Sequence, residues 1–233
     1  MKYFLQNPEI DQTIREIRKT IRLSMNGVVS DAMKEKGVIY KQNYGVQIPR
    51  LKQMTASYTS NHDLAQRLWA LKIRETMILA TLLQPADKFT KQNAEDWLKD
   101  IHHIELAEQT CMNLFSKLPY ADEWAMRCIL SENLWEQIVG FTLITRVREQ
   151  ISAERVVEIT KRATALLDTD IFHLYKSISV CLGRLCRNGK EVAERILTEL
   201  NSMGNSEKES YRYALAEIRA EISFLGILIF ENE

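Results

Sequence analysis

The sequence predicts an all-α fold in which antiparallel helix pairs stack into a curved solenoid. A helical phrase recurs along the chain, with Glu75, Glu105 and Glu136 at equivalent places among apolar residues. The intervals between these glutamates are 30 and 31 residues. No strand-like alternation separates the recurrences, and 8 Gly and 4 Pro in 233 residues fit short connections. A repeat of this length is typical of helix pairs that cover one another's apolar faces, and the concave face of such a stack is the expected ligand site.

The composition is that of a globular protein with a sizeable core. Hydrophobic residues make up 45% of the chain and charged residues 27%. A solenoid of this size is one continuous unit, so we expect a single helical repeat domain over residues 1–233. Lys+Arg and Asp+Glu both number 31, so the net charge is zero. The chain as a whole is therefore not drawn to nucleic acid or membranes, and an anion-binding surface requires cations segregated on one face.

No leader, membrane span or disulfide framework is expected. The N-terminal apolar run is too short for a signal peptide, and the longest apolar run near the end, residues 222–230, is too short to cross a membrane. The cysteines form no CxxC pair and lie in helical segments, at Cys111, Cys128, Cys181 and Cys186. We expect buried thiols in a protein of the reducing cytoplasm.

The first helices are marked by their capping residues. Asn7-Pro8-Glu9 has the composition of a helix start. Apolar residues then follow helical spacing at Ile10, Ile14, Ile17, Ile21 and Met25. After Asn26-Gly27 a second helix is expected over residues 28–36, and residues 40–49 read as a loop. Pro49 is placed to open the helix that carries Leu51 and Met54.

The remaining elements also read as helices with identifiable ends. A helix capped by residues 60–63 pairs with one that includes residues 77–83 and stops at Gln84-Pro85. Residues 93–96 open a short helix at Trp97, and helices follow over residues 102–118, 123–131 and 134–149. Ser152 caps a helix that reaches Leu167, and Asp170 caps one over residues 171–187 that Asn188-Gly189 closes. A helix over residues 191–200, a polar linker at 202–206 and a last helix over 207–230 complete the chain.

The sequence resembles the HEAT-like alkylpurine DNA glycosylases, the DNA alkylation repair family, from about Tyr44 to about Arg187. The matching phrases are Tyr44-Gly45-Val46-x-x-Pro49-x-Leu51, Leu64-Ala65…Leu68-Trp69…Arg74-Glu75…Ala80, Trp97-x-x-Asp100, Leu114-Phe115, Trp124, Asn133-x-Trp135 and Phe172-x-x-x-Lys176-Ser177-Ile178…Leu182-x-Arg184. The resemblance implies a right-handed solenoid of HEAT-like helix pairs. It also implies duplex DNA as the partner and release of N3- or N7-alkylated purines as the activity.

Members with glycosylase activity hold the lesion with two tryptophans, an aspartate and an arginine. Indole faces attract a cationic alkylated purine, a carboxylate stabilises positive charge at the sugar, and the arginine holds a phosphate. By resemblance, Trp97 is the first tryptophan and Asp100 the nearest carboxylate, one position before the family's aspartate, where Ile101 stands. The arginine positions after Trp135 hold Gln137 and Ile138, and Val180 replaces the second tryptophan. The chain therefore resembles a divergent member that lacks most of the family's catalytic residues.

Each candidate residue also has a purely structural interpretation. Trp97 either stacks on a base or packs between helices, and Asp100 is either the catalytic carboxylate or an ordinary helix residue. The other tryptophans recur at repeat boundaries and are assigned to the core, at Trp69, Trp124 and Trp135. His102 and Glu105 share a helical face, but two ligands are too few for zinc, so we predict neither a metal site nor a cofactor.

Basic residues gather in the C-terminal half of the chain. The predicted DNA-binding residues are Arg146, Arg148, Lys176, Arg184 and Arg187, with Arg155, Lys161, Arg162 and Lys190 nearby. The last three of the five are spaced by 8 and 3 residues, which places them close to one helical face. They either form a ladder along DNA phosphates or are ordinary solvated cations near helix C-termini. The segment from residue 207 onward is acidic and is expected to stay away from DNA.

Two functions from different classes follow. The first is a DNA alkylation repair-like protein that binds duplex DNA, alkylated or distorted, in a concave groove with weak or absent glycosylase activity. If excision is retained, Trp97 is the stacking platform and Asp100 stabilises charge. The alternative is a helical-repeat scaffold without catalytic activity, whose groove binds another protein. A continuous positive band from Arg146 to Lys190 favours DNA, whereas an apolar or mixed groove favours a protein ligand.

Overall fold

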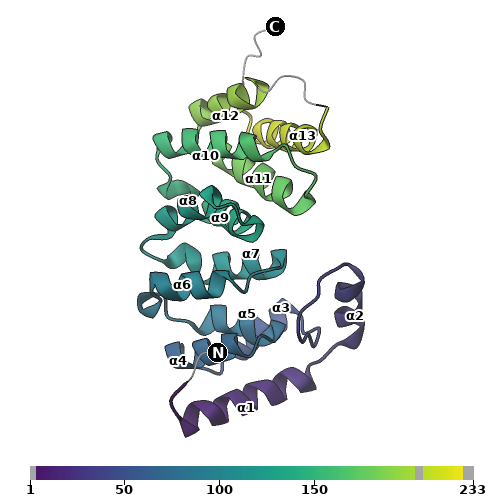
Figure 1. The fold of residues 1–233 in the computed structure, drawn as a ribbon, viewed down its shortest axis with the longest axis vertical. Helices are drawn as coiled ribbons and strands as arrows, with labels where there is room; N and C mark the ends of the chain where they lie inside the picture. Colours follow the sequence, from purple (N-terminus) through teal and green to yellow (C-terminus); the bar gives the residue numbers. More distant parts are fainter. Residues whose placement is uncertain (1–3, 203–206, 228–233) are drawn as a thin grey trace. The chain divides into compact units, whose positions relative to one another are not determined.

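The computed structural model describes residues 4–202 and 207–227, and in this part of the chain the regular structure is helical apart from a single bridge between Gln42 and Ile73. Two compact units divide the chain, Met1–Leu118 and Pro119–Glu233. Each unit is built of helices that follow one another along the chain, most of them with short connections, and a longer loop joins α2 to α3 (Figure 1). This helical content agrees with the all-α prediction.

Unit 1 (Met1–Leu118) contains α1 to α7. Their bounds are α1 Pro8–Leu23, α2 Gly27–Glu35, α3 Ile48–Thr55, α4 His62–Ala70, α5 Arg74–Leu83, α6 Lys91–Leu98 and α7 Ile104–Asn113. Helix α5 is the central element, because it packs against α3, α4 and α7, while α1 packs on α4. All but one residue of α5 is buried, including the charged Arg74 and Glu75. The core of unit 1 is therefore assembled around a helix that carries an ion pair.

Unit 2 (Pro119–Glu233) contains α8 to α13. Their bounds are α8 Ala121–Leu130, α9 Leu134–Val147, α10 Ala153–Leu166, α11 Phe172–Leu185, α12 Lys190–Ser202 and α13 Glu209–Phe224. Helix α9 packs against α8 and α11, α11 packs against α13, and α10 packs against α12. Gly140 of α9 lies so close to α8 that an added Cβ would be 2.8 Å from the backbone nitrogen of Ile129. Helices α8 and α9 are consecutive and form one such pair, and the contacts of α9 with α11, α11 with α13 and α10 with α12 join every second helix, as expected for a stack of helix pairs.

Most of the predicted helix starts are confirmed. The side chains of Asn7, Asn61 and Ser152 accept hydrogen bonds from the backbone at the starts of α1, α4 and α10. Met25 lies beyond the end of α1 and is 67% exposed, so the apolar stripe ends at Ile21. The four cysteines are buried thiols, as expected.

Several boundaries differ from the prediction. Trp97 lies near the end of α6 rather than at its start, because Thr90 and Asn93 form a capping box that begins the helix at Lys91. Asp170 does not cap α11, since Ile171 is the N-cap residue and no side chain bonds there. The last helix ends at Phe224. Of the predicted linker at 202–206, Ser202 belongs to α12 and residues 203–206 lie outside the described residues, as do residues 228–230 of the predicted last helix.

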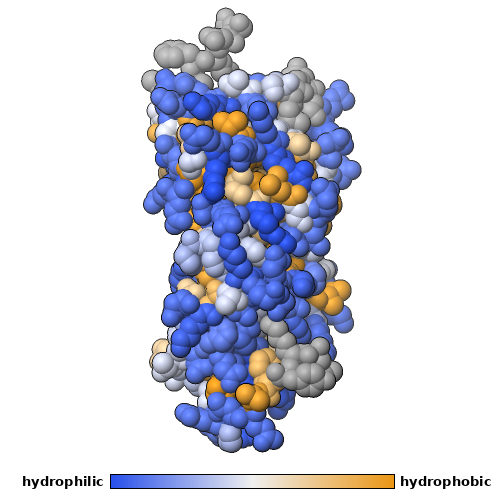
Figure 2. All heavy atoms as spheres, turned by 60° about the vertical axis from the view of Figure 1, so that its left-hand side comes forward, coloured by the Kyte–Doolittle hydropathy of each residue, from blue (hydrophilic) through white to orange (hydrophobic). Residues whose placement is uncertain are grey.

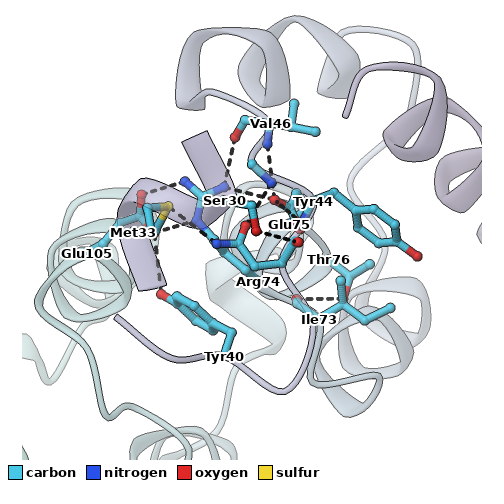
Figure 3. Close-up of polar contacts among 12 residues, drawn as sticks. Ser30, Met33, Tyr40, Tyr44, Val46, Ile73, Arg74, Glu75, Thr76 and Glu105 are labelled. Carbon is cyan, nitrogen blue, oxygen red and sulfur yellow. Dashed lines mark hydrogen bonds and ion pairs between the residues drawn. The ribbon is translucent and has the colours of Figure 1, made fainter. Parts of the chain in front are cut away.

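A buried polar network fastens the loop before α3 to α5 and α7 (Figure 3). The carboxylate of Glu75, fully buried, accepts hydrogen bonds from the backbone nitrogens of Tyr44 and Val46, each at 3.2 Å. Arg74 donates to the carbonyl oxygen of Val46 at 2.8 Å and to both carboxylate oxygens of Glu105, at 2.7 and 2.5 Å. These bonds satisfy loop backbone groups that would otherwise be buried without partners.

The same network changes the acidity of two groups. Burial, and then the charge of Glu105, raises the pKa of Tyr40 far above its ordinary value. Burial alone would lower the pKa of Arg74, but hydrogen bonds and charge from Glu105 and Glu75 outweigh it and raise that pKa. Arg74 therefore stays charged between its two carboxylates. The recurring glutamates of the sequence thus mark an internal contact rather than a ligand site at this position.

The view in Figure 2 shows one face on which hydrophilic residues cover most of the surface and apolar residues form separate patches. No helix in the described ranges 4–202 and 207–227 has the length and hydropathy needed to cross a membrane.

Candidate functional site

Trp97 is packed in the core of unit 1. Its side chain stacks on Trp69 with ring centroids 4.0 Å apart and planes inclined by 4°, and Phe89 meets it edge-on at 4.9 Å. Its Nε1 donates a hydrogen bond to Oε1 of Gln66 at 3.2 Å, and only 1% of the residue is exposed. In this arrangement neither face of the Trp97 indole is open to a base.

Asp100 lies beyond the end of α6, in the connection to α7. Its Oδ2 accepts a hydrogen bond from Nε1 of Trp69 at 2.7 Å and pairs with the ammonium group of Lys72. Lys72 has a left-handed backbone with φ of 55°, which is uncommon for a residue with a side chain. Trp69 thus links the two candidate residues, since it stacks on Trp97 and bonds to Asp100. The Asp100 carboxylate is 26% exposed, but both of its partners are groups of unit 1 itself.

The other positions of the family pattern carry no charge, and all of them except Val180 are buried. Ile101 and Ile138 are fully buried, and Gln137 is 5% exposed with its Nε2 donating to the carbonyl oxygen of Ser131 at 2.7 Å. Val180 is 39% exposed on α11. None of these side chains can supply the cation or the second indole face that the family's lesion site contains.

Trp69 and Trp124 are buried, which agrees with their assignment to the core, whereas Trp135 is only partly covered. Around His102 and elsewhere in the described part, no group of three or more metal-binding side chains gathers.

Two of the predicted DNA-binding residues meet at the end of α9. Arg148 donates a hydrogen bond to Oδ1 of Asn188 at 3.1 Å, and Nδ2 of Asn188 donates to the carbonyl oxygen of Arg148 at 2.8 Å. These two hydrogen bonds hold the turn that carries Arg187 against the end of α9. Arg148 and Arg187 line the same depression of unit 2, with Glu149 and Asn188 beside them. Arg146 is exposed on the preceding turn of α9.

Three of the five cations, Arg187 among them, lie along α11 and the turn that follows it. Arg184 is 3.6 Å from Glu221 of α13, and Nε of Arg187 pairs with the same carboxylate. Lys176 is exposed near the start of α11, nine residues before the end of this helix at Leu185. Its ammonium nitrogen is 5.5 Å from the ring centroid of Phe172. Arg187 belongs to the 3-10 turn Cys186–Asn188 rather than to α11, yet it still meets Arg184 at Glu221.

The cationic surface of unit 2, formed by Arg146, Arg148, Lys176, Arg184 and Arg187, is therefore mixed in charge. Glu149 pairs with Arg148, and Glu221 pairs with two further arginines. Lys190 is 3.6 Å from Glu194 on α12. The nearby arginines are used inside unit 2, since Arg155 pairs with Asp122 and Arg162 donates to the carbonyl oxygen of Ile129 at 2.8 Å.

Unit 1 carries a second cationic face, on α1, that was not predicted from the sequence. Arg15, Arg18, Lys19 and Arg22 of α1 line one shallow depression of unit 1, together with Leu23. Their spacing of 3, 4 and 7 residues from Arg15 is the signal that identifies one helical face.

The family of the chain follows from comparison with known proteins. The family model described as DNA alkylation repair enzyme matches residues 30–218. A solved structure from a new family of proteins related to the HEAT-like repeat DNA glycosylases, with affinity for branched DNA structures, aligns with a TM-score of 0.77. That alignment has 11% identity and covers 91% of this chain and 95% of that one, which confirms the fold of HEAT-like repeats. A comparison with curated proteins gives no match. Because the family model spans most of its length, the chain belongs to the DNA alkylation repair enzyme family.

Proposed function

We propose that this chain is a DNA-binding repair protein that contacts phosphates of duplex DNA through the cationic surface of unit 2. The observation that carries the proposal is the meeting of Arg148 and Arg187, from different elements, in one depression. Guanidinium groups suit phosphate oxygens because they donate paired hydrogen bonds and stay charged. The exposed Arg146 and Lys176 extend the set of cations available in unit 2.

Alkylated or distorted duplexes are the proposed targets. Family membership supports DNA damage as the context, and the structural neighbour's affinity for branched DNA supports testing junctions beside linear duplexes. Contacts to phosphates carry no base sequence information, so binding is expected to depend on DNA shape rather than sequence.

We further propose that base excision is weak or absent. A base-stacking role for Trp97 requires the indole to leave Trp69, and a charge-stabilising role for Asp100 competes with its bonds to Trp69 and Lys72. Release of 7-methylguanine from methylated DNA tests this point, with Asp100→Asn as the variant and Asp96→Asn as the matched control. Release that Asp100→Asn abolishes and Asp96→Asn leaves intact would contradict the proposal and assign Asp100 to catalysis.

DNA binding is tested by the salt dependence of affinity for a fluorescent duplex. Each neutralised phosphate contributes a slope of about −0.9 to the plot of log K against log salt. The Arg148→Gln/Arg187→Gln variant is expected to make the slope shallower by about 2, because two phosphate contacts are lost. Arg212→Gln/Arg219→Gln removes the same charge from exposed positions of α13 and should leave the slope unchanged. A wild-type protein that does not bind DNA refutes the proposal.

A protein-interaction scaffold is the second candidate, and one groove favours it. Helices α10 and α12 border a depression of mixed character, lined by Val156, Val157, Thr160, Glu191, Glu194, Arg195, Thr198 and Glu199. Three glutamates beside two valines suit a peptide with basic and apolar side chains. Binding of such peptides that Glu191→Gln/Glu199→Gln weakens, in a protein that ignores DNA, would favour this candidate.

A further inference from the structure

Helix α1 presents a compact cationic face. Arg15, Arg18, Lys19 and Arg22 fall within about 100° of arc and about 10 Å of helix length, given 3.6 residues per turn and 1.5 Å per residue. Arg15, Lys19 and Arg22 are exposed, and Arg18 is partly buried. All four line the same depression. In a chain of zero net charge, this is a local concentration of positive charge.

The acids close to this face are engaged elsewhere. Asp11, one turn before Arg15, accepts a hydrogen bond from Arg67 of α4 at 3.2 Å. Glu16 accepts one from Gln12 at 2.9 Å. Within the described ranges none of the four cations of α1 forms an ion pair, whereas the cations proposed for DNA in unit 2 share Glu149 and Glu221. The field of the α1 face is therefore less neutralised than that of the cationic surface of unit 2.

The neutral side chains of Tyr44 and Gln42 lie beside this face, and one guanidinium nitrogen has no hydrogen-bond acceptor. Nε of Arg18 is shielded from solvent and has no hydrogen-bond partner among the residues described. Nε of Arg22 is 3.5 Å from the hydroxyl of Tyr44, which also accepts from Nε2 of Gln42 at 2.6 Å. An anion at this face would meet several hydrogen-bond donors.

The opposite side of α1 indicates which polyanion fits. Ile10, Ile17 and Ile21 are buried against the rest of unit 1, so the apolar face of this helix is already covered. A basic helix that binds membranes uses an apolar face to enter the lipid interface, and α1 has only Leu23 exposed beside its cations. A phosphodiester backbone needs no apolar face, since it offers about one charge per 3.4 Å along each strand. The length of the cationic face matches about three successive phosphates.

We infer that the face formed by Arg15, Arg18, Lys19 and Arg22 is a second DNA-binding surface, which binds successive phosphates of one strand independently of the cationic surface of unit 2. This inference rests on the proposed DNA binding and adds a site in unit 1 to it.

The test compares two charge-matched quadruple variants in a fluorescence-anisotropy titration of a DNA duplex at several salt concentrations. The first is Arg15→Gln/Arg18→Gln/Lys19→Gln/Arg22→Gln. The control is Lys34→Gln/Lys36→Gln/Lys88→Gln/Lys117→Gln, which removes four charges from exposed, scattered positions of unit 1. The α1 variant is expected to make the salt slope shallower by about 3, and the control to keep the wild-type slope. Circular dichroism and thermal melting check folding, and Arg15→Gln/Arg22→Gln, expected to change the slope by about 2, replaces the quadruple variant if it does not fold.

The outcomes separate this inference from the proposal for unit 2. Wild-type protein without affinity for DNA removes both. Wild-type binding with the same slope in the α1 variant overturns the α1 site alone, and so does an equal loss in the control. Binding to vesicles that contain phosphatidylserine is the last measurement. If the α1 variant loses binding to these vesicles but keeps the wild-type salt slope for DNA, the face would be assigned to a membrane surface instead.

Discussion

Replacing Glu75 by glutamine should destabilise unit 1 far more than the removal of an exposed charge does. The carboxylate is fully buried and accepts hydrogen bonds from the nitrogens of Tyr44 and Val46 and from Arg74, the last at 2.9 Å. Hydrogen bonds to charged groups contribute about 1.5–3 kcal/mol each. A glutamine of the same shape keeps one oxygen but turns its amide toward donors, so about two of these bonds are lost.

The expected loss in free energy of unfolding is therefore about 3–5 kcal/mol, in the range for breaking a buried ion pair. Glu105→Gln should cost less, about 1–2 kcal/mol, because 27% of that side chain is exposed. Glu108→Gln, on the exposed side of α7, is the control and should change stability by less than about 0.5 kcal/mol.

Urea denaturation measures the free energy, and hydrogen exchange with mass spectrometry locates the effect. Peptides that cover the loop at residues 40–47 should lose protection in Glu75→Gln, while peptides of unit 2 keep it, because the network is confined to unit 1. If Glu75→Gln is as stable as Glu108→Gln and the loop stays protected, the network does not hold the loop in place and the reasoning is wrong.

Three further predictions concern the core. Gly140→Ala should destabilise unit 2 by about 1–3 kcal/mol, because the new Cβ would meet Ile129 at 2.7 Å, and unchanged urea denaturation would contradict the close approach. Native protein should resist thiol reagents, since burial raises the pKa of Cys186 to about 12 and raises that of Cys181 further; rapid labelling before denaturation would count against this packing. Because burial raises the pKa of Tyr40 in the folded state, the free energy of unfolding should fall as pH rises above the ordinary value of 10.0. Tyr40→Phe should reduce that fall, and identical pH profiles would argue against the buried hydroxyl.

The sequence was sufficient where the signal is local. Helix starts at Asn7, Asn61 and Ser152 depend on a side chain and a backbone group within three residues, and the apolar periodicity of α1 depends on one helical face. Asp170 failed as a cap because the same residue type is common in turns, where its side chain need not reach the helix.

The candidate site was less predictable because its decisive contacts join residues far apart in the chain. Trp97 stacks on Trp69. The residues next to either tryptophan in the sequence do not show whether its indole packs on another indole or is open to bind a base. Glu221 lies 34 residues after Arg187, so the sharing of one carboxylate by two arginines cannot be read from the spacing along α11. The cationic face of α1 is different, since its signal was local and was hidden only by the zero net charge of the chain.

The carboxylate of Glu221 competes with any anionic ligand for Arg184 and Arg187. A monovalent anion such as chloride or acetate that displaces the Glu221 carboxylate replaces one negative charge by another, so little binding free energy is gained. A polyanion can offer one negative group to the guanidinium of Arg184 and another to that of Arg187, whereas in the free protein both guanidinium groups share the single carboxylate of Glu221. A ligand that carries several charges in a row is therefore better matched to Arg184 and Arg187 than a simple anion is.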